Sequence, residues 1–168
     1  MAVNELEPAL ASEVERLADA LRARGWLLAA AESCSGGLIA AACTSLAGSS
    51  DWFERGWVTY SNAAKSEQLG VPAALIAQHG AVSTEVARAM AEGALAHSGA
   101  QLAVAVTGIA GPSGATPGKP VGTVWLAIAL RGSATDVHGL HLSGDRAAVR
   151  RQTVEHALRA LNARLAAA

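Results

Sequence analysis

The chain has 168 residues, of which 51% are hydrophobic and 4% aromatic, and its formal net charge is −1 at pH 7. This length suits one domain with a substantial core, and we expect residues 1–168 to form it. The near-neutral charge gives no reason to expect nucleic acid or an anionic membrane as a partner. No apolar run is long enough to cross a bilayer, and the acidic, polar amino terminus is not a secretory signal, so we expect a cytoplasmic protein.

Helical periodicity and turn residues predict a helix, a strand and a second helix in the first third of the chain. Between residues 5 and 24 leucine and valine recur at helical spacing, and Gly25 is a natural helix end. Residues 26–30 form an apolar strand that runs into Ser33. A further helix begins at Leu38 and ends in the turn cluster that follows it.

The middle of the chain is predicted to form one strand followed by three helices. Residues 52–60 are rich in aromatic and β-branched residues, which favours a strand. Ser61 and Asn62 can cap a short helix that carries Lys65, and a second short helix follows Pro72. Ser83 is a typical helix N-cap. The helix after it should bury a stripe made of Val86, Met90, Ala94 and His97.

The last third begins with a continuously apolar strand over residues 102–106, of the kind buried on both faces. Residues 121–130 and 135–142 form a predicted hairpin, and Asp145 caps a last helix with an apolar spine. Helices alternate with strands in the first part of the chain, and strands adjacent in sequence follow in the last third. The predicted fold is therefore α/β, a three-layer α/β/α single domain with a mixed, mostly parallel sheet.

Ser33 is the sharpest candidate nucleophile, because a strand, a Ser/Gly turn and a helix start meet there. The first N–H groups of a helix lack intrahelical partners and suit an anion or a developing oxyanion. The alternative is a purely structural role, in which the glycines allow a tight strand-to-helix turn and a serine caps the helix. A serine hydroxyl needs a base, and Lys65 qualifies if burial lowers its pKa; otherwise it is a solvated helix lysine.

Other candidates are weaker. His79, His97 and His156 each have an ordinary structural explanation, and His138 and His141 would point to opposite faces of a strand, which makes them poor joint metal ligands. The two cysteines, Cys34 and Cys43, have neither disulfide-framework nor zinc spacing. Cys34 is an alternative nucleophile, since a helix N-terminus lowers the pKa of a thiol. The glycine-rich loops at 35–37 and 108–114 could bind phosphate, although neither matches a nucleotide fingerprint. Arg146 could pair with an anion or simply be a surface arginine.

Six motifs together resemble the CinA C-terminal domain family, and they occur in the family's order over nearly the whole chain. The motifs are Ala31–Gly37, Gly48–Ser50, Gly56–Lys65, Gln78–Ser83, Thr107–Pro112 and Lys119–Val124. The stand-alone bacterial members of this family are nicotinamide-nucleotide amidohydrolases. The resemblance implies hydrolysis of nicotinamide mononucleotide to nicotinic acid mononucleotide and ammonia, in the salvage of NAD.

The resemblance also implies a serine–lysine mechanism without a metal or an organic cofactor. Its implied catalytic residues are Ser33, Lys65 and Tyr60. Backbone N–H groups at the helix start formed by residues 35–37 would hold the oxyanion, and the loop from Gly108 to Gly114 would hold the substrate phosphate with Arg146. The implied substrate-binding residues are Ser35, Gly36, Gly37, Thr107, Gly108, Gly111 and Arg146.

Two other functions stay open on the sequence. One is a catalytically silent nucleotide-binding or regulatory module, which has no chemical need for both Ser33 and Lys65. The other is a serine amidase for a different small amide, which would act on amides without a phosphate. Members of the family generally form oligomers, so we also expect a homo-oligomer.

Overall fold

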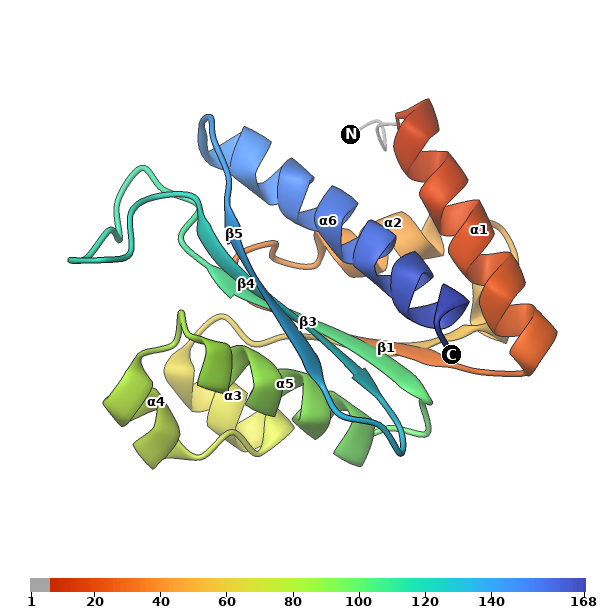
Figure 1. The fold of residues 1–168 in the computed structure, drawn as a ribbon, viewed down its shortest axis with the longest axis horizontal. Helices are drawn as coiled ribbons and strands as arrows, with labels where there is room; N and C mark the ends of the chain where they lie inside the picture. Colours follow the sequence, from red (N-terminus) through yellow and green to blue (C-terminus); the bar gives the residue numbers. More distant parts are fainter. Residues whose placement is uncertain (1–6) are drawn as a thin grey trace.

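The computed structural model describes residues 7–168 and consists of one five-stranded sheet with helices on both faces (Figure 1). In chain order the elements are α1 (Pro8–Arg24), β1 (Leu28–Glu32), α2 (Leu38–Thr44), the 3₁₀ helix η1 (Ser49–Asp51), β2 (Phe53–Val58), α3 (Asn62–Leu69), α4 (Ala73–His79), α5 (Thr84–Ala96), β3 (Leu102–Gly108), β4 (Thr123–Leu130), β5 (Asp136–His141) and α6 (Arg146–Ala166).

The strand order is β2-β1-β3-β4-β5. Strand β1 pairs in parallel with β2 and with β3, whereas β4 is antiparallel to both of its neighbours. Only β4 therefore runs against the common direction, and the predicted mixed, mostly parallel sheet is confirmed. Helices α1, α2 and α6 cover one face and α3, α4 and α5 the other, which completes the three predicted layers (Figure 1).

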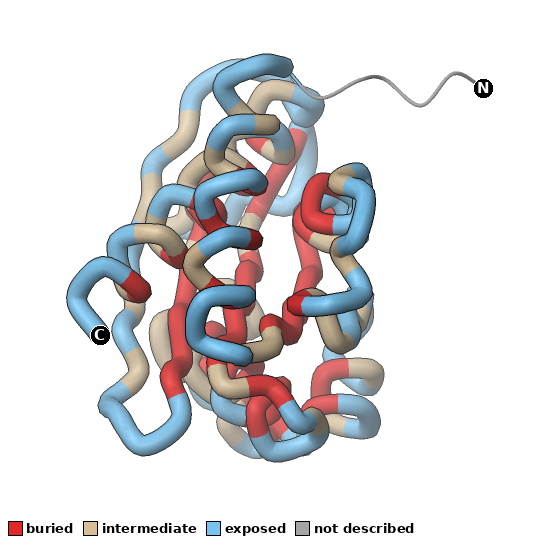
Figure 2. The backbone as a smooth tube through the Cα atoms, turned by 90° about the vertical axis from the view of Figure 1, so that its right-hand side faces the viewer, coloured by how far each residue is buried: buried red, intermediate tan, exposed pale blue. Residues whose placement is uncertain are grey.

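The two faces of the sheet differ in the size of their side chains. Along β3, Leu102 and Val104 face α1 and α6, whereas Ala103 and Ala105 face α5. Strand β4 repeats this alternation, because successive side chains of a strand point to opposite faces. Alanine lets α5 lie close to the sheet, and Figure 2 shows the buried strands running between the helical layers.

The predicted helix caps at Ser61, Ser83 and Asp145 are confirmed. Each side chain accepts a hydrogen bond from the backbone N–H three residues later. This fixes where α3, α5 and α6 begin, and α3 and α6 carry two of the predicted site residues. The prediction that the first helix starts at Glu5 lies outside the described residues.

The prediction that His97 belongs to the buried stripe of α5 is wrong. The helix ends at Ala96, and His97 follows as an exposed C-cap. Its ring Nδ1 lies 2.8 Å from the carbonyl of Gly93, one turn earlier. The side chain therefore contacts the last turn of its own helix instead of packing in the core, and the same Gly93 carbonyl also accepts from the His97 backbone N–H at 3.0 Å.

Over residues 7–168, none of the helices combines the length and the apolar character that crossing a membrane requires.

Candidate active site

Three strands end at the same edge of the sheet and bring the predicted site residues together. Ser33 follows β1, Tyr60 follows β2, and Thr107 lies near the end of β3. Because β1, β2 and β3 are parallel, their carboxyl ends form one crevice, where open α/β sheets usually bind ligands. A cavity of about 310 Å³ lies there, and Ser33, Tyr60, Lys65, Thr107 and Arg146 all line it.

The central contact of this cavity is between Ser33 and Lys65. Their Oγ and Nζ atoms are 3.1 Å apart, and Lys65 also donates a 2.8 Å hydrogen bond to the carbonyl of Thr59. Lys65 is only 1% exposed, although both Lys65 and Ser33 line the cavity. Ser61 sets this position, because its cap starts α3 and places Lys65 on the inner side of the first turn.

Burial lowers the pKa of Lys65 from its ordinary value, because a low-dielectric surrounding disfavours the charged ammonium. No carboxylate in the described part of the chain forms a salt bridge with it. A thiolate at Cys34 would oppose this effect, but burial raises the pKa of the Cys34 thiol to about 11. The pair Ser33 and Lys65 therefore has the form of a hydroxyl beside an amine whose pKa is lowered by burial.

Cys34 also lines the cavity, but its surroundings disfavour the reactive thiolate. With a pKa of about 11, the thiol is neutral near pH 7. The reactive form of cysteine is the thiolate. The structure therefore favours Ser33 over Cys34 as the nucleophile.

Tyr60 and Arg146 meet at the mouth of the cavity. Arg146 is the first residue of α6, and its guanidinium donates to the Tyr60 hydroxyl at 2.9 Å and to the carbonyl of Gly111 at 2.9 Å. The Tyr60 side chain is 61% exposed, and none of its recorded hydrogen bonds reaches Ser33 or Lys65. This geometry suits substrate binding at the rim better than proton transfer at the nucleophile.

A wall of the cavity comes from the end of β3, which lies beside Ser33, and from the loop after it. The hydroxyl of Thr107 donates to the carbonyl of Ala81 at 2.9 Å, which ties β3 to the start of α5. Gly108 and Gly111 also line the cavity. Gly111 has a φ of +82°, and a Cβ there would lie 2.5 Å from Val121, so only glycine fits without strain. The loop then extends past the edge of the sheet (Figure 1).

The structure does not bring Ser35, Gly36 and Gly37 to the cavity surface. Instead, the buried carboxylate of Glu32 accepts hydrogen bonds from the Ser35 hydroxyl at 2.6 Å and from the Gly37 N–H at 3.1 Å. The N–H groups of Ile39 and Ala40 bind the same carboxylate, so the start of α2 is already occupied by an anion.

Glu32 is a buried polar residue of this region that the sequence reasoning did not name as a candidate. It stands directly before Ser33, and acidic residues near a helix N-terminus are favourable, which is the signal that could have identified it.

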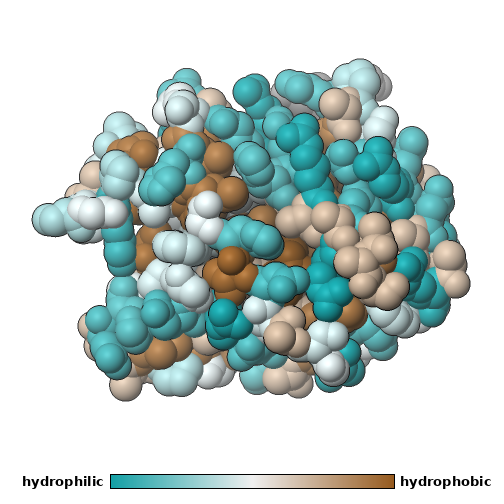
Figure 3. All heavy atoms as spheres, in the orientation of Figure 1, coloured by the Kyte–Doolittle hydropathy of each residue, from teal (hydrophilic) through white to brown (hydrophobic). Residues whose placement is uncertain are grey.

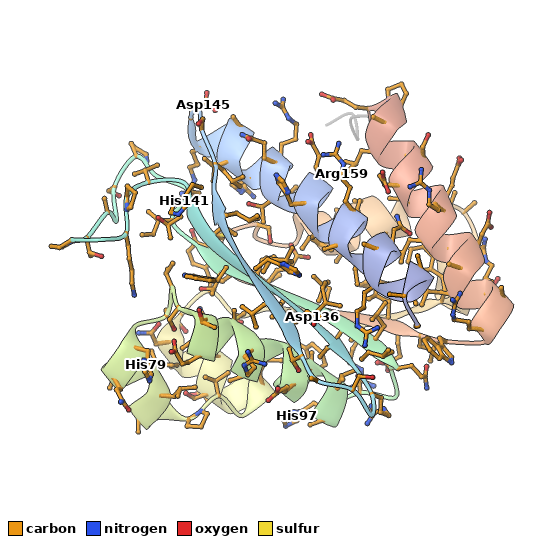
Figure 4. All side chains as sticks on the ribbon, viewed as in Figure 1. His79, His97, Asp136, His141, Asp145 and Arg159 are labelled. Atoms are coloured by element: carbon orange, nitrogen blue, oxygen red, sulfur yellow. The ribbon has the colours of Figure 1, made fainter. Side chains whose placement is uncertain are left out.

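Other polar groups and a second hollow lie away from this cavity. His79, His97 and His141 are on separate elements in Figure 4, and within residues 7–168 no group of three or more potential metal ligands assembles.

A roomier groove of about 470 Å³ lies between β5 and α6, and hydrophobic side chains show in the middle of the face drawn in Figure 3. The groove has mostly aliphatic walls and no paired nucleophile and base, so the smaller cavity is the candidate active site.

Comparison with known proteins identifies close relatives. The CinA C-terminal domain family matches residues 10–165. The protein named nicotinamide-nucleotide amidohydrolase PncC from Pseudomonas putida is 57% identical over 143 residues, which cover 85% of this chain and 89% of that protein. The protein of the same name from Escherichia coli K12 is 51% identical over 147 residues, which cover 88% of this chain and 89% of that protein.

Longer proteins and solved structures also match. A CinA-like protein from Citrifermentans bemidjiense is 58% identical over 144 residues, and the match spans 86% of this chain but only 34% of that protein. The crystal structure of the competence/damage inducible protein CihA from Agrobacterium tumefaciens superposes with a TM-score of 0.92 at 42% identity. That superposition covers 97% of this chain and 98% of the other.

Proposed function

The chain belongs to the CinA C-terminal domain family, and from this premise we propose that it hydrolyses the carboxamide of nicotinamide mononucleotide to nicotinic acid mononucleotide and ammonia, as a step in the salvage of NAD. The observation that carries the proposal is the 3.1 Å pairing of Ser33 with a buried Lys65 in a cavity. The two relatives that bear the amidohydrolase name, at 57% and 51% identity, support the choice of substrate.

In the first step neutral Lys65 takes the proton of Ser33 while the Ser33 oxygen attacks the amide carbon. The hydrogen bond from Lys65 to the Thr59 carbonyl holds the amine in place, so that its lone pair faces the hydroxyl. The carbonyl oxygen becomes an oxyanion in a tetrahedral intermediate. A pKa lowered by burial and a fixed geometry together make Lys65 suited to act as this base.

The oxyanion needs donors on the cavity side of Ser33, because Glu32 occupies the start of α2. The backbone N–H groups of Cys34 and Ala110 belong to cavity-lining residues, and within residues 7–168 neither donates a recorded hydrogen bond to an oxygen atom. We assign the oxyanion to these two groups. Each preorganised donor of this kind typically contributes on the order of 3 kcal/mol to the stabilisation of the transition state.

The intermediate then collapses as the C–N bond breaks, and Lys65 returns its proton to the leaving ammonia. An ester between Ser33 and the nicotinoyl group remains. Water attacks this ester, Lys65 accepts the proton of the water, and the Ser33 oxygen leaves and regains a proton. Atoms and charges balance over the two steps, and the enzyme returns to its starting state.

The substrate phosphate would sit at the rim beside Arg146. Its guanidinium already donates to the carbonyl of Gly111 and to the Tyr60 hydroxyl, so it is held in position where an anion can approach. Tyr60 is exposed at the same rim and offers a hydroxyl to the ribose phosphate. The expected homo-oligomer stays a prediction.

Ammonia release from nicotinamide mononucleotide and from nicotinamide riboside, which lacks the phosphate, tests the proposal. We expect release from the mononucleotide and at least about tenfold lower kcat/KM for the riboside, the loss of one charged contact. Equal rates would favour an amidase for a different amide. No release, together with a rise of Tm on adding the mononucleotide, would favour the silent binding module.

A further inference from the structure

We propose that Glu32 is a positioning residue for the Ser33 nucleophile: its buried carboxylate binds the turn and the helix start that follow Ser33, and so holds the serine hydroxyl against Lys65. This inference rests on the proposed function. The side chain of Glu32 does not line the cavity, so it acts on the reaction only through the backbone that it fixes.

The carboxylate of Glu32 is 1% exposed and accepts four hydrogen bonds. Its Oε2 accepts from the Ser35 hydroxyl at 2.6 Å, the Gly37 N–H at 3.1 Å and the Ile39 N–H at 3.0 Å. Its Oε1 accepts from the Ala40 N–H at 2.8 Å. A single side chain at the end of β1 therefore satisfies N–H groups that the first turn of α2 would otherwise leave without partners.

The negative charge of Glu32 is balanced by dipoles instead of a cation. Among the described residues none of the basic side chains forms a salt bridge with it. The nearby Arg150 of α6 donates to the Ser35 carbonyl at 3.1 Å. The positive end of α2 and the Ser35 hydroxyl stabilise the carboxylate, and the carboxylate in turn holds α2 against β1.

Ser33 lies inside the loop that these bonds close. The chain from Glu32 to Ser35 returns on itself through the 2.6 Å contact, and the Gly36 N–H donates to the Ser33 carbonyl at 3.0 Å. Neighbouring side chains at a strand end point to opposite faces, so Glu32 faces α2 while Ser33 faces Lys65. The bonds that hold the Glu32 side chain toward α2 therefore also hold the Ser33 side chain toward Lys65.

The variant Glu32→Gln tests this role, because it keeps the shape and replaces one acceptor oxygen with an NH₂ group that faces N–H donors. At a temperature where circular dichroism shows the variant folded, we expect kcat for nicotinamide mononucleotide to fall about tenfold or more, while KM changes less than about twofold. The pH profile of kcat/KM should keep its shape, because Lys65 is unaltered. Glu15→Gln, at an exposed carboxylate on α1, is the matched control.

A second variant covers the case in which Glu32→Gln fails to fold. Ser35→Ala removes the 2.6 Å contact but leaves the three backbone bonds, so we expect a folded protein with a smaller fall in kcat at unchanged KM. Wild-type kcat in either folded variant, or a loss confined to KM, would overturn the proposal. Wild-type protein that releases no ammonia would instead refute the proposed function, so the two failures are distinguishable.

Discussion

Replacing Lys65 with methionine should remove catalysis and leave the protein folded. The variant deletes the amine that lies 3.1 Å from Ser33 but keeps a side chain of similar length in the buried position. Loss of a general base typically lowers the rate by about 10²- to 10⁴-fold. We expect kcat to fall in this range, with the α/β signature of circular dichroism retained.

The effect of Lys65→Met on stability follows from two opposing contributions. The carbonyl of Thr59 loses its partner, which costs about 1–3 kcal/mol. Burying an apolar side chain of this size contributes about 1.5–3 kcal/mol in the other direction. The free energy of unfolding should therefore change little, in contrast to the large change in rate.

The pH dependence of that stability difference has a definite sign. Burial lowers the pKa of Lys65 in the folded protein below the ordinary 10.5, so the unfolded chain binds this proton at pH values where the folded protein has released it. Wild-type stability therefore gains from rising pH between the lowered value and 10.5. The variant lacks this gain, so its stability relative to wild type should be greatest below the lowered pKa of Lys65 and decrease toward pH 10.5.

Ammonia release, chemical denaturation at pH 7 and pH 10, and the control variant Arg159→Met together test the Lys65 prediction. Arg159 is exposed on α6 and lies beside the groove away from the cavity (Figure 4), so the control should keep wild-type activity. A folded Lys65→Met protein with more than about a tenth of the wild-type kcat would refute the assignment of Lys65 as the base.

Two further predictions concern the rim and the neighbouring thiol. Arg146→Ala should raise KM for nicotinamide mononucleotide by about tenfold or more in steady-state assays, because the guanidinium is assigned to the substrate phosphate. The KM for the riboside, which lacks the phosphate, should change little. An equal rise of KM for both substrates would contradict this assignment. Cys34→Ala should lose less than about tenfold in kcat, because a thiol with a pKa of about 11 is not the nucleophile near pH 7. A loss as large as that of Ser33→Ala, with folding checked by circular dichroism, would instead favour Cys34.

Local signals predicted much of the fold. Ser61, Ser83 and Asp145 are side chains that satisfy helix N–H groups from adjacent sequence, so the starts of three helices could be predicted. Continuous apolar runs and β-branched residues are also local signals, and they predicted the strands. His97 was misplaced because periodicity does not show where a helix ends, and α5 ends one residue before it.

The site was predictable in its members but not in its contacts. Ser33 and Lys65 are 32 positions apart, and only parallel pairing of β1 with β2 places their side chains together. The helix start after Gly37 was expected to hold the oxyanion, because its N–H groups lack helical partners. Glu32 lies five residues earlier and occupies them instead. Whether a strand-end carboxylate turns toward the following helix depends on three-dimensional packing, which periodicity alone does not describe.

The measurement that tests the central claim most directly is ammonia release from nicotinamide mononucleotide by wild type and by folded Ser33→Ala. The account predicts release by wild type and a fall of kcat by at least about 10³-fold in the variant, because no attacking oxygen remains. Wild-type rates in folded Ser33→Ala would show that the reaction does not pass through an ester at Ser33, and the pairing of Ser33 with Lys65 would then need a different explanation.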